Sequence, residues 1–74
     1  MLEMHYDISF TSRQGVLLRI LTEITRRALD LNFVHANNGN VVLKLEVNER
    51  QDAQLRRAWK NTIDVTHVYA CPEK

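Results

Sequence analysis

The stretch with the clearest chemical meaning is Gln14-Gly15, directly before an apolar periodic segment that begins at Leu17. A glycine beside the start of a helix lets backbone amides approach a ligand closely, and the free amides and the helix dipole there favour a carboxylate. Gly15 would equally permit a tight turn from a strand into a helix. These residues therefore indicate either a carboxylate-binding loop or a structural turn.

Metal ligands and nucleophiles occur in the sequence, but their spacing is poor for a site. His67 and Cys71 are four residues apart on a predicted strand, which separates their Cα atoms by about 13 Å, too far for one metal ion. His5 and Asp7 share a face of another predicted strand, with no third ligand near them in the sequence. Ser9 follows them without a spacing known to bring a nucleophile beside its base. We therefore expect no metal site, no catalytic residue and no cofactor bound by this chain.

The composition is that of one globular domain spanning residues 1–74, with a core over about 4–71 and a frayed tail at 72–74. Ten Lys and Arg against nine Asp and Glu give a net charge of +1, which provides no field to attract nucleic acid or an anionic membrane. No apolar run is long enough to cross a bilayer, and the first ten residues lack the pattern of a signal peptide. We therefore expect a cytoplasmic protein without nucleic-acid or membrane partners.

Hydrophobic periodicity predicts six elements in the order βαββαβ. Strands are predicted over 4–10, 31–36, 41–47 and 63–71, and helices from a Thr11/Gln14 capping box to about Leu29 and over 50–61, the second capped by Asn48 or a neighbour. The residues expected on the buried face of the third strand are Val41, Leu43, Leu45 and Val47. The apolar stripe of the second helix is Leu55, Ala58 and Trp59. This order predicts a ferredoxin-like α+β sandwich, a four-stranded antiparallel sheet with both helices on one face.

The segment "QGVLLR", residues 14–19, resembles the "QGV-x-x-R" phosphate-binding loop of acylphosphatases, which share the βαββαβ order. In that family the arginine and the loop amides hold the acyl phosphate, and an asparagine after the second strand positions the attacking water. The resemblance implies Arg19 as the phosphate ligand. The chain departs from the family in having Thr11 at a glycine position and Ala36 at the asparagine position, with Asn37 one place away. Without a placed water the hydrolysis would lose its nucleophile.

Over residues 4–71 the sequence resembles an ACT domain, the small βαββαβ module that senses amino acids in biosynthetic enzymes. The resemblance rests on the loop from Ser12 to Gly15, on "VLLRILTEITRRALDL" after it, and on "LNFVHA". The short length and the ending "TIDVTHVYAC" resemble, more narrowly, the short regulatory subunit of acetolactate synthase of the isozyme II type. The resemblance implies an ACT-like fold and a regulatory, non-catalytic function.

The ACT resemblance also implies an effector site at a dimer interface, where the loop of one protomer faces the start of the partner's second strand. The residues at those positions are Ser12, Gln14 and Gly15 on the loop, and Asp30, Leu31 and Asn32 on the far side. Valine-sensing small subunits tend to carry asparagine at the positions of Ser12 and Asp30. A serine is shorter, and the Asp30 carboxylate would repel that of an amino acid unless it engages the ammonium group. These differences argue against valine as the effector.

ACT domains pair side by side through the second strand and first helix, which implies a homodimer interface containing Leu17, Leu21, Ala28 and Phe33. The residues themselves also favour pairing. The predicted edge strand 31–36 carries little charge to discourage a second strand, and a thin sheet cannot cover all three of Leu17, Leu21 and Ala28.

By the same resemblance, the partner is the large catalytic subunit of acetolactate synthase, which carries thiamine diphosphate, Mg²⁺ and FAD. This chain would activate and stabilise that subunit in branched-chain amino acid biosynthesis without touching the substrate. A candidate surface for the large subunit is the open sheet face with His5, Asp7, Lys44 and Glu46. The alternatives are a stand-alone ACT module that senses an amino acid and an acylphosphatase-like hydrolase.

Overall fold

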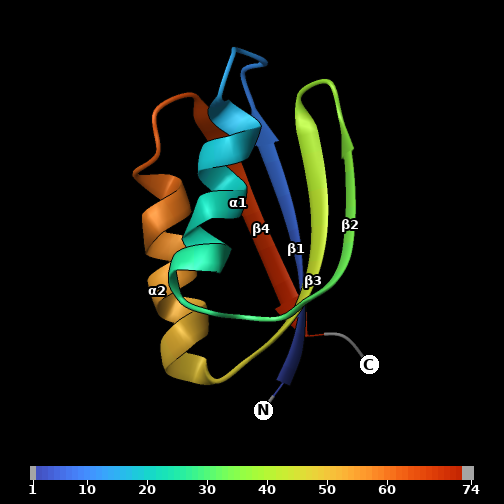
Figure 1. The fold of residues 1–74 in the computed structure, drawn as a ribbon, viewed down its shortest axis with the longest axis vertical. Coiled ribbons are helices and arrows are strands. Elements are labelled where there is room, and N and C mark those ends of the chain that lie inside the picture. Colours follow the sequence, from blue (N-terminus) through green and yellow to red (C-terminus); the bar gives the residue numbers. More distant parts are fainter. Residues whose placement is uncertain (1, 73–74) are drawn as a thin grey trace.

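Four antiparallel strands form one layer of the structure and two helices cover one of its faces (Figure 1), over residues 2–72, which the computed structural model describes. In chain order the elements are β1 (Leu2–Phe10), α1 (Val16–Arg26), β2 (Leu31–Asn37), β3 (Asn40–Val47), α2 (Glu49–Lys60) and β4 (Val65–Pro72). The predicted ferredoxin-like α+β architecture is confirmed. Of the predicted tail, residues 73–74 lie outside the described residues, and Pro72 belongs to β4. Neither described helix is long and apolar enough to span a membrane.

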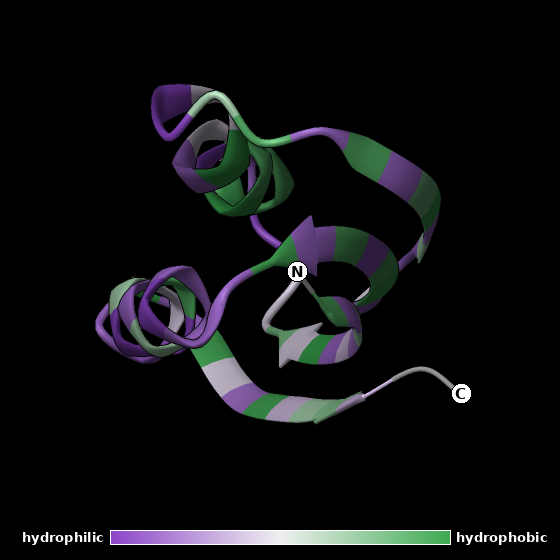
Figure 2. Ribbon diagram, turned by 90° about the horizontal axis from the view of Figure 1, so that it is seen from below, coloured by the Kyte–Doolittle hydropathy of each residue, from purple (hydrophilic) through white to green (hydrophobic). Residues whose placement is uncertain are grey.

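The sheet has the order β2-β3-β1-β4, so β1 and β3 are central and β2 and β4 are edge strands. Along β1 every second side chain from Met4 to Phe10 is buried against the helices. The residues predicted to point inward from β3 are all fully buried, namely Val41, Leu43, Leu45 and Val47. Figure 2 shows the alternation as green and purple stripes along the strands. The two-residue period of the sequence thus decides which face of the sheet carries the core.

The start of α1 depends on backbone conformation and not on the predicted capping box. Gly15 is the N-cap, with a φ of 86°, and no side chain caps α1. A Cβ here would meet nothing within 4 Å, so glycine is favoured by its left-handed backbone and not by lack of space. The Thr11 amide donates to the carbonyl of Asp64 over 2.7 Å, which ties Thr11 to the loop before β4. The Thr11/Gln14 capping box was wrong because this long-range bond is invisible in the local sequence.

The end of α1 at Arg26 comes earlier than predicted. Ala28 has a φ of 52°, its amide donates to the carbonyl of Thr25, and the Leu29 amide donates to that of Ile24. These two bonds form the Schellman arrangement, in which a left-handed residue closes a helix. The apolar period continues to Leu29 because that side chain still packs against the core after the helix has ended.

The asparagine before α2 is the predicted cap. Asn48 Oδ1 accepts a hydrogen bond from the Gln51 amide over 2.8 Å, and Gln51 Oε1 accepts one from the Asn48 amide over 2.9 Å. At the other end, β4 begins at Val65 and not at the predicted Ile63. Ile63 is exposed and precedes Asp64, whose φ of 72° interrupts the extended chain. A β-branched residue outside a strand thus misplaced the predicted start of β4.

Two aromatic residues and one carboxylate join α2 to the rest of the core. The Trp59 indole donates to the carbonyl of Ile20 over 3.0 Å, and its ring lies edge-on to that of Tyr6 with centroids 5.0 Å apart. The Tyr6 hydroxyl donates to Asp52 over 2.6 Å, and Asp52 also pairs with Arg56 over 2.8 Å. Through these contacts α2 is bonded to both β1 and α1, which gives a small core directional as well as hydrophobic contacts.

Tyr6→Phe is expected to lower the free energy of unfolding at neutral pH by about 1–3 kcal/mol, because it removes a donor from the buried Asp52 carboxylate. Burial and then the hydrogen bond to Asp52 raise the pKa of the Tyr6 hydroxyl above its usual value of about 10. Above that pH the unfolded chain loses the proton while the folded chain keeps it, so this contribution to stability falls as the pH rises. Urea unfolding at neutral and alkaline pH measures both effects.

The matched control is Tyr69→Phe, since Tyr69 is 58% exposed on β4. The free energy of unfolding of this variant should fall at alkaline pH as much as that of the wild type. In Tyr6→Phe the fall should be smaller. Equal declines in Tyr6→Phe and wild type would mean that the Tyr6 hydroxyl does not cause the pH dependence.

Candidate functional site

The loop between β1 and α1 is held in place from two sides. The Ser12 hydroxyl donates to the side-chain oxygen of Asn38 in the turn between β2 and β3. The Arg13 guanidinium lies 3.6 Å from the carboxylate of Asp64, in the loop before β4. These contacts fix the position of the loop that carries three of the predicted effector residues, all of them exposed: Ser12, Gln14 and Gly15.

The first turn of α1 has the features of an anion site. Gly15 turns the chain into the helix. The Val16 amide donates to the Arg13 carbonyl over 3.3 Å, and no side chain caps the other amides of that turn. Uncapped amides at a helix start can donate to a carboxylate, which the helix dipole also favours. Gly15 is therefore both a structural turn and a residue that keeps the approach to these amides open. The structural turn is confirmed by this geometry, and the carboxylate-binding loop stays a prediction.

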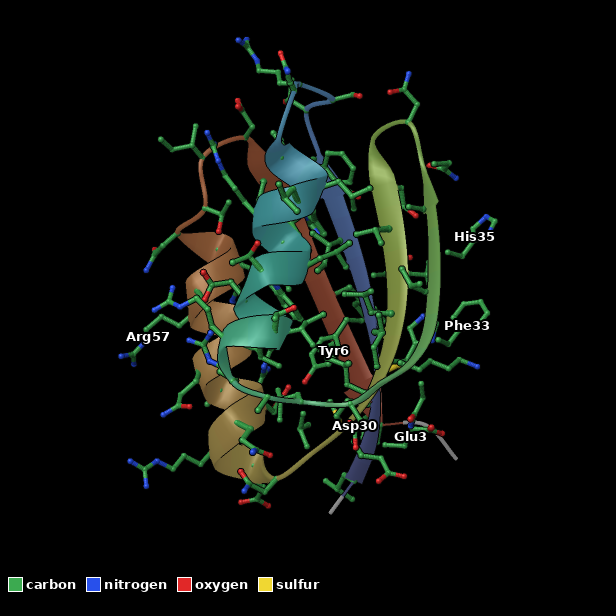
Figure 3. All side chains as sticks on the ribbon, in the orientation of Figure 1. Glu3, Tyr6, Asp30, Phe33, His35 and Arg57 are labelled. Carbon is green, nitrogen blue, oxygen red and sulfur yellow. The ribbon has the colours of Figure 1, made fainter. Side chains whose placement is uncertain are left out.

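The other predicted effector residues, Asp30, Leu31 and Asn32, lie at the far end of α1, where the chain enters β2. Figure 3 shows Asp30 at that end, remote from the β1–α1 loop. The 11 residues of α1 extend over about 16 Å, so one chain does not bring the two groups together. Asn32 is also engaged within the chain, since its amide nitrogen donates to Glu3 over 2.9 Å.

The edge strand β2 is open to solvent along its whole length. All seven of its residues are exposed, including Leu31 at 40% and Val34 at 45%. The end of β2 lies next to the β1–α1 loop, because Ser12 in that loop contacts Asn38 directly after β2. An antiparallel partner strand would set the start of one β2 beside the end of the other. A second copy could therefore supply the half of the site that one chain lacks.

The four predicted dimer residues do not share one surface. Leu17 and Leu21 are half-buried beside the core on α1, and Ala28 is exposed after its end. Phe33 pairs with Lys44 and faces the open side of the sheet, where the Lys44 ammonium lies 5.4 Å from its ring centre. Figure 3 shows Phe33 and His35 projecting away from the helices.

A register shift explains the direction of Phe33. The pairing of β2 with β3 is irregular between Leu31 and Phe33, which breaks the simple alternation along β2. Beyond the shift, Val34 pairs with Leu43 and Ala36 with Val41, so Val34 and Ala36 face the helices. The sequence analysis did not single out Val34. A two-residue period cannot reveal it, because a bulge moves every later side chain to the other face.

Comparison with known proteins gives similarity in structure only. No protein-family model and no characterised protein matches the sequence. An ACT domain from GTP pyrophosphokinase of Chlorobium tepidum superposes with a TM-score of 0.75 at 15% identity, covering 95% of this chain and 97% of that one. The chain has an ACT-like fold. Acylphosphatase from Bacillus subtilis is also similar, with a TM-score of 0.77 and 20% identity over 100% of this chain and 87% of that one.

The ACT-like fold also occurs within a larger enzyme. Aspartokinase III of E. coli, in complex with lysine and aspartate, matches with a TM-score of 0.63 and 10% identity, over 96% of this chain and 17% of that one. At these identities the similarities establish the ferredoxin-like fold and leave the function to the site residues.

The acylphosphatase features are only partly present on this fold. Arg19 is exposed in α1, where its amide donates to the carbonyl of Gly15. Ala36 occupies the position of the water-binding asparagine and faces the helices, whereas the neighbouring Asn37 pairs with Asn40 on the opposite face of the sheet. The loop and Arg19 therefore keep only the sequence spacing of the acylphosphatase motif, while the asparagine side chain lies on the other side of β2.

The metal-ligand types are scattered over the described residues. Within 2–72 no three His, Cys, Asp or Glu side chains are grouped as a metal ion would require. His5 and Cys71 are direct neighbours across β1 and β4 on the open face, a pair that the sequence analysis did not identify. Strand pairing brings them together, and local spacing could not have predicted it.

Proposed function

We propose that this chain is a non-catalytic ACT-type regulatory module that binds an amino acid between two copies of itself. The observation that carries the proposal is the separation of the two predicted halves of the site at opposite ends of α1, beside an exposed edge strand. One chain does not bring the two halves together, and in our proposal a two-fold dimer does so across β2. The ACT-like fold supports this proposal.

The proposed ligand is a free amino acid, because the two halves offer complementary charges. The uncapped first turn of α1 offers amides to the ligand carboxylate. The exposed carboxylate of Asp30, supplied by the other protomer, offers a partner to the ammonium group. Ser12 has a short side chain, and its hydroxyl already donates to Asn38. It therefore does not replace the asparagine that valine-sensing subunits carry at this position, which argues against valine as the ligand.

More narrowly, we propose that the module is the regulatory subunit of acetolactate synthase. Its action would be a coupling free energy, in which the dimer binds the active form of the large subunit better than the inactive form and shifts that equilibrium. The large subunit would carry thiamine diphosphate, Mg²⁺ and FAD. The residue resemblance in the loop, α1 and the last strand supports this assignment.

Acetolactate formation by the catalytic subunit from the same source, with this chain titrated in, tests the assignment. A saturable rise in rate at fixed stoichiometry is expected, with or without amino acids present. A flat titration, together with no complex on size exclusion, would reject the acetolactate synthase role and leave the stand-alone amino-acid sensor. Direct calorimetric binding of amino acids to the isolated dimer then tests that sensor.

Gly15→Ala is expected to weaken effector binding about tenfold, because a left-handed non-glycine residue costs about 1–2 kcal/mol and shifts the first-turn amides. Activation of the large subunit should persist, since the substitution leaves β2 and the sheet intact. Calorimetry with the amino-acid effector measures the change. Gly39→Ala is the matched control, because Gly39 also has a positive φ of 103° but lies in the β2–β3 turn. Equal losses in both variants would mean general destabilisation and not a role for the loop.

An acylphosphatase-like activity is the second candidate, favoured by the fold similarity to the Bacillus subtilis enzyme and by the Gln14-Gly15-Val16 loop followed by Arg19. Hydrolysis of benzoyl phosphate by the purified chain, lost in Arg19→Ala, would establish the enzyme and overturn the regulatory proposal. No turnover above the spontaneous rate would remove this candidate.

A further inference from the structure

A groove between α1 and α2 collects positive charge on the face of the molecule away from the sheet. Its volume is about 590 Å³, and four arginines line it. Arg26 is the last residue of α1 and Arg27 follows it directly, whereas Arg50 and Arg57 belong to α2. Figure 3 shows Arg57 on this outer side of α2, opposite Phe33 and His35. Six of the ten Lys and Arg residues line this groove or the depression beside it, although the chain carries a net charge of only +1.

Acidic side chains compensate only part of this charge. Glu23 pairs with both Arg26 and Arg27, over 3.3 and 2.6 Å, so one carboxylate serves two guanidinium groups. Within residues 2–72, Arg50 and Arg57 have no ion-pair or hydrogen-bond partner for their guanidinium groups. Outside this groove Arg56 is paired with Asp52. The groove therefore holds an excess of about three positive charges over its acids.

Arg50 is placed where it does not help its own helix. It lies in the first turn of α2, the end at which the helix dipole favours negative charge and disfavours a cation. Arg26 and Arg27 have a structural explanation, because a cation at the end of α1 complements the dipole there. Arg50 has none, which points to a ligand that uses its charge.

The spacing along α2 suits an extended anion. Arg50 and Arg57 are seven residues apart, on one side of the helix and about 10 Å apart along its axis. Ala53 and Gln54 lie between them along the helix, and both line the groove with Ala58. Guanidinium groups bind phosphate oxygens in bidentate fashion, and successive phosphates can engage successive arginines.

We propose that this groove binds a small polyphosphate, organic or inorganic, at a site separate from the amino-acid site. One amino-acid carboxylate would neutralise a single charge, whereas a phosphate group with a charge of about −1.5 to −2 matches the excess with two or three groups. A nucleic acid fits less well, because the groove is limited to about 590 Å³ and its positive charge does not continue onto the open sheet face, where Lys44 is outnumbered by Glu3, Asp7 and Glu46. The proposal does not depend on the acetolactate synthase role.

Calorimetric titration of the whole chain with inorganic tripolyphosphate, in magnesium-free buffer, tests the site. Binding is expected that weakens as ionic strength rises, and Arg50→Gln and Arg57→Gln should each weaken it about tenfold. Arg13→Gln, the same charge change on an exposed residue of the β1–α1 loop outside the groove, should leave it unchanged. A parallel titration with a nucleoside triphosphate separates the sources: tighter binding than tripolyphosphate means an organic ligand whose base packs on the groove.

Three results would overturn the proposal. One is absence of binding at low ionic strength in a chain that circular dichroism finds folded. Another is binding that persists in Arg50→Gln and Arg57→Gln but disappears in Arg19→Gln, which would locate the anion at the β1–α1 loop. The third is tighter binding of a single-stranded oligonucleotide than of tripolyphosphate, again lost in the groove variants, which would make the surface a nucleic-acid site.

Discussion

Trp59→Ala should lower the free energy of unfolding by about 3–5 kcal/mol, which is the usual cost of removing a buried tryptophan. Trp59 is fully buried and is the largest such side chain in the core. Its removal would leave a cavity beside Tyr6 and deprive the Ile20 carbonyl of the indole donor. A domain of this size has a thin core and a small total stability, so most molecules of the variant should be unfolded or partly unfolded at 37 °C.

Urea and thermal unfolding, followed by far-UV circular dichroism, measure this effect. Trp59→Phe separates its two components, because phenylalanine restores most of the volume but not the N–H donor, and its loss should be about half as large. Ile63→Ala is the surface control, since Ile63 is 73% exposed and its loss should stay within about 0.5 kcal/mol. A Trp59→Ala variant as stable as Ile63→Ala would show that α2 does not depend on this anchor.

The sequence predicted the parts of the fold in which local pattern and packing agree. The alternation of β3 identified its buried residues because each of them meets the helices at every second position. Asn48 was identified because a capping box satisfies amides within three residues of the cap. The βαββαβ order then leaves few ways to cover one face of a four-stranded sheet, and the ferredoxin-like plait is one of them.

The boundaries that were wrong depend on contacts or conformations absent from local pattern. Thr11 bonds to Asp64, more than fifty residues away in the chain, and so lies outside α1. Ala28 and Asp64 adopt positive φ although neither is glycine, and these residues end α1 and precede β4. Phe33 turns to the open face because the chain is irregular after Leu31. Hydrophobic periodicity depends only on residue spacing, so it cannot predict a long-range hydrogen bond, a positive φ or a bulge.

The two candidate sites differ in how far the sequence alone could predict them. Gly15 carries a local signal, since a glycine before an apolar periodic segment marks a turn into a helix. The arginine groove has no such signal, because Arg26 and Arg50 face a common space only after α1 and α2 pack side by side. In the sequence, the arginines of α2 were indistinguishable from an ordinary solvated helix face. Their uncompensated charge is a property of the packed helices.

Val34→Lys should weaken self-association about 30-fold or more in the proposed dimer paired through β2. Val34 is 45% exposed in the single chain and faces the helix side of the edge strand, through its pairing with Leu43. In a β2-to-β2 dimer this position would be covered, and an unpaired charge buried at an interface costs about 2–5 kcal/mol, or one decade of affinity for each 1.4 kcal/mol. Because the amino-acid site needs both protomers, effector binding should be lost together with the dimer.

Sedimentation velocity over a concentration series measures the association, and calorimetry with the effector measures the site. Thr66→Lys is the matched control, since Thr66 is an exposed β-branched residue on β4, the opposite edge of the sheet. If Thr66→Lys dissociates the dimer and Val34→Lys does not, the pairing runs through β4. The start of β2 then faces no loop from a partner, and a shared amino-acid site between Gly15 and Asp30 is no longer possible. If only Val34→Lys dissociates the dimer, both halves of the site meet across β2, and the loss of effector binding follows from the loss of the partner chain.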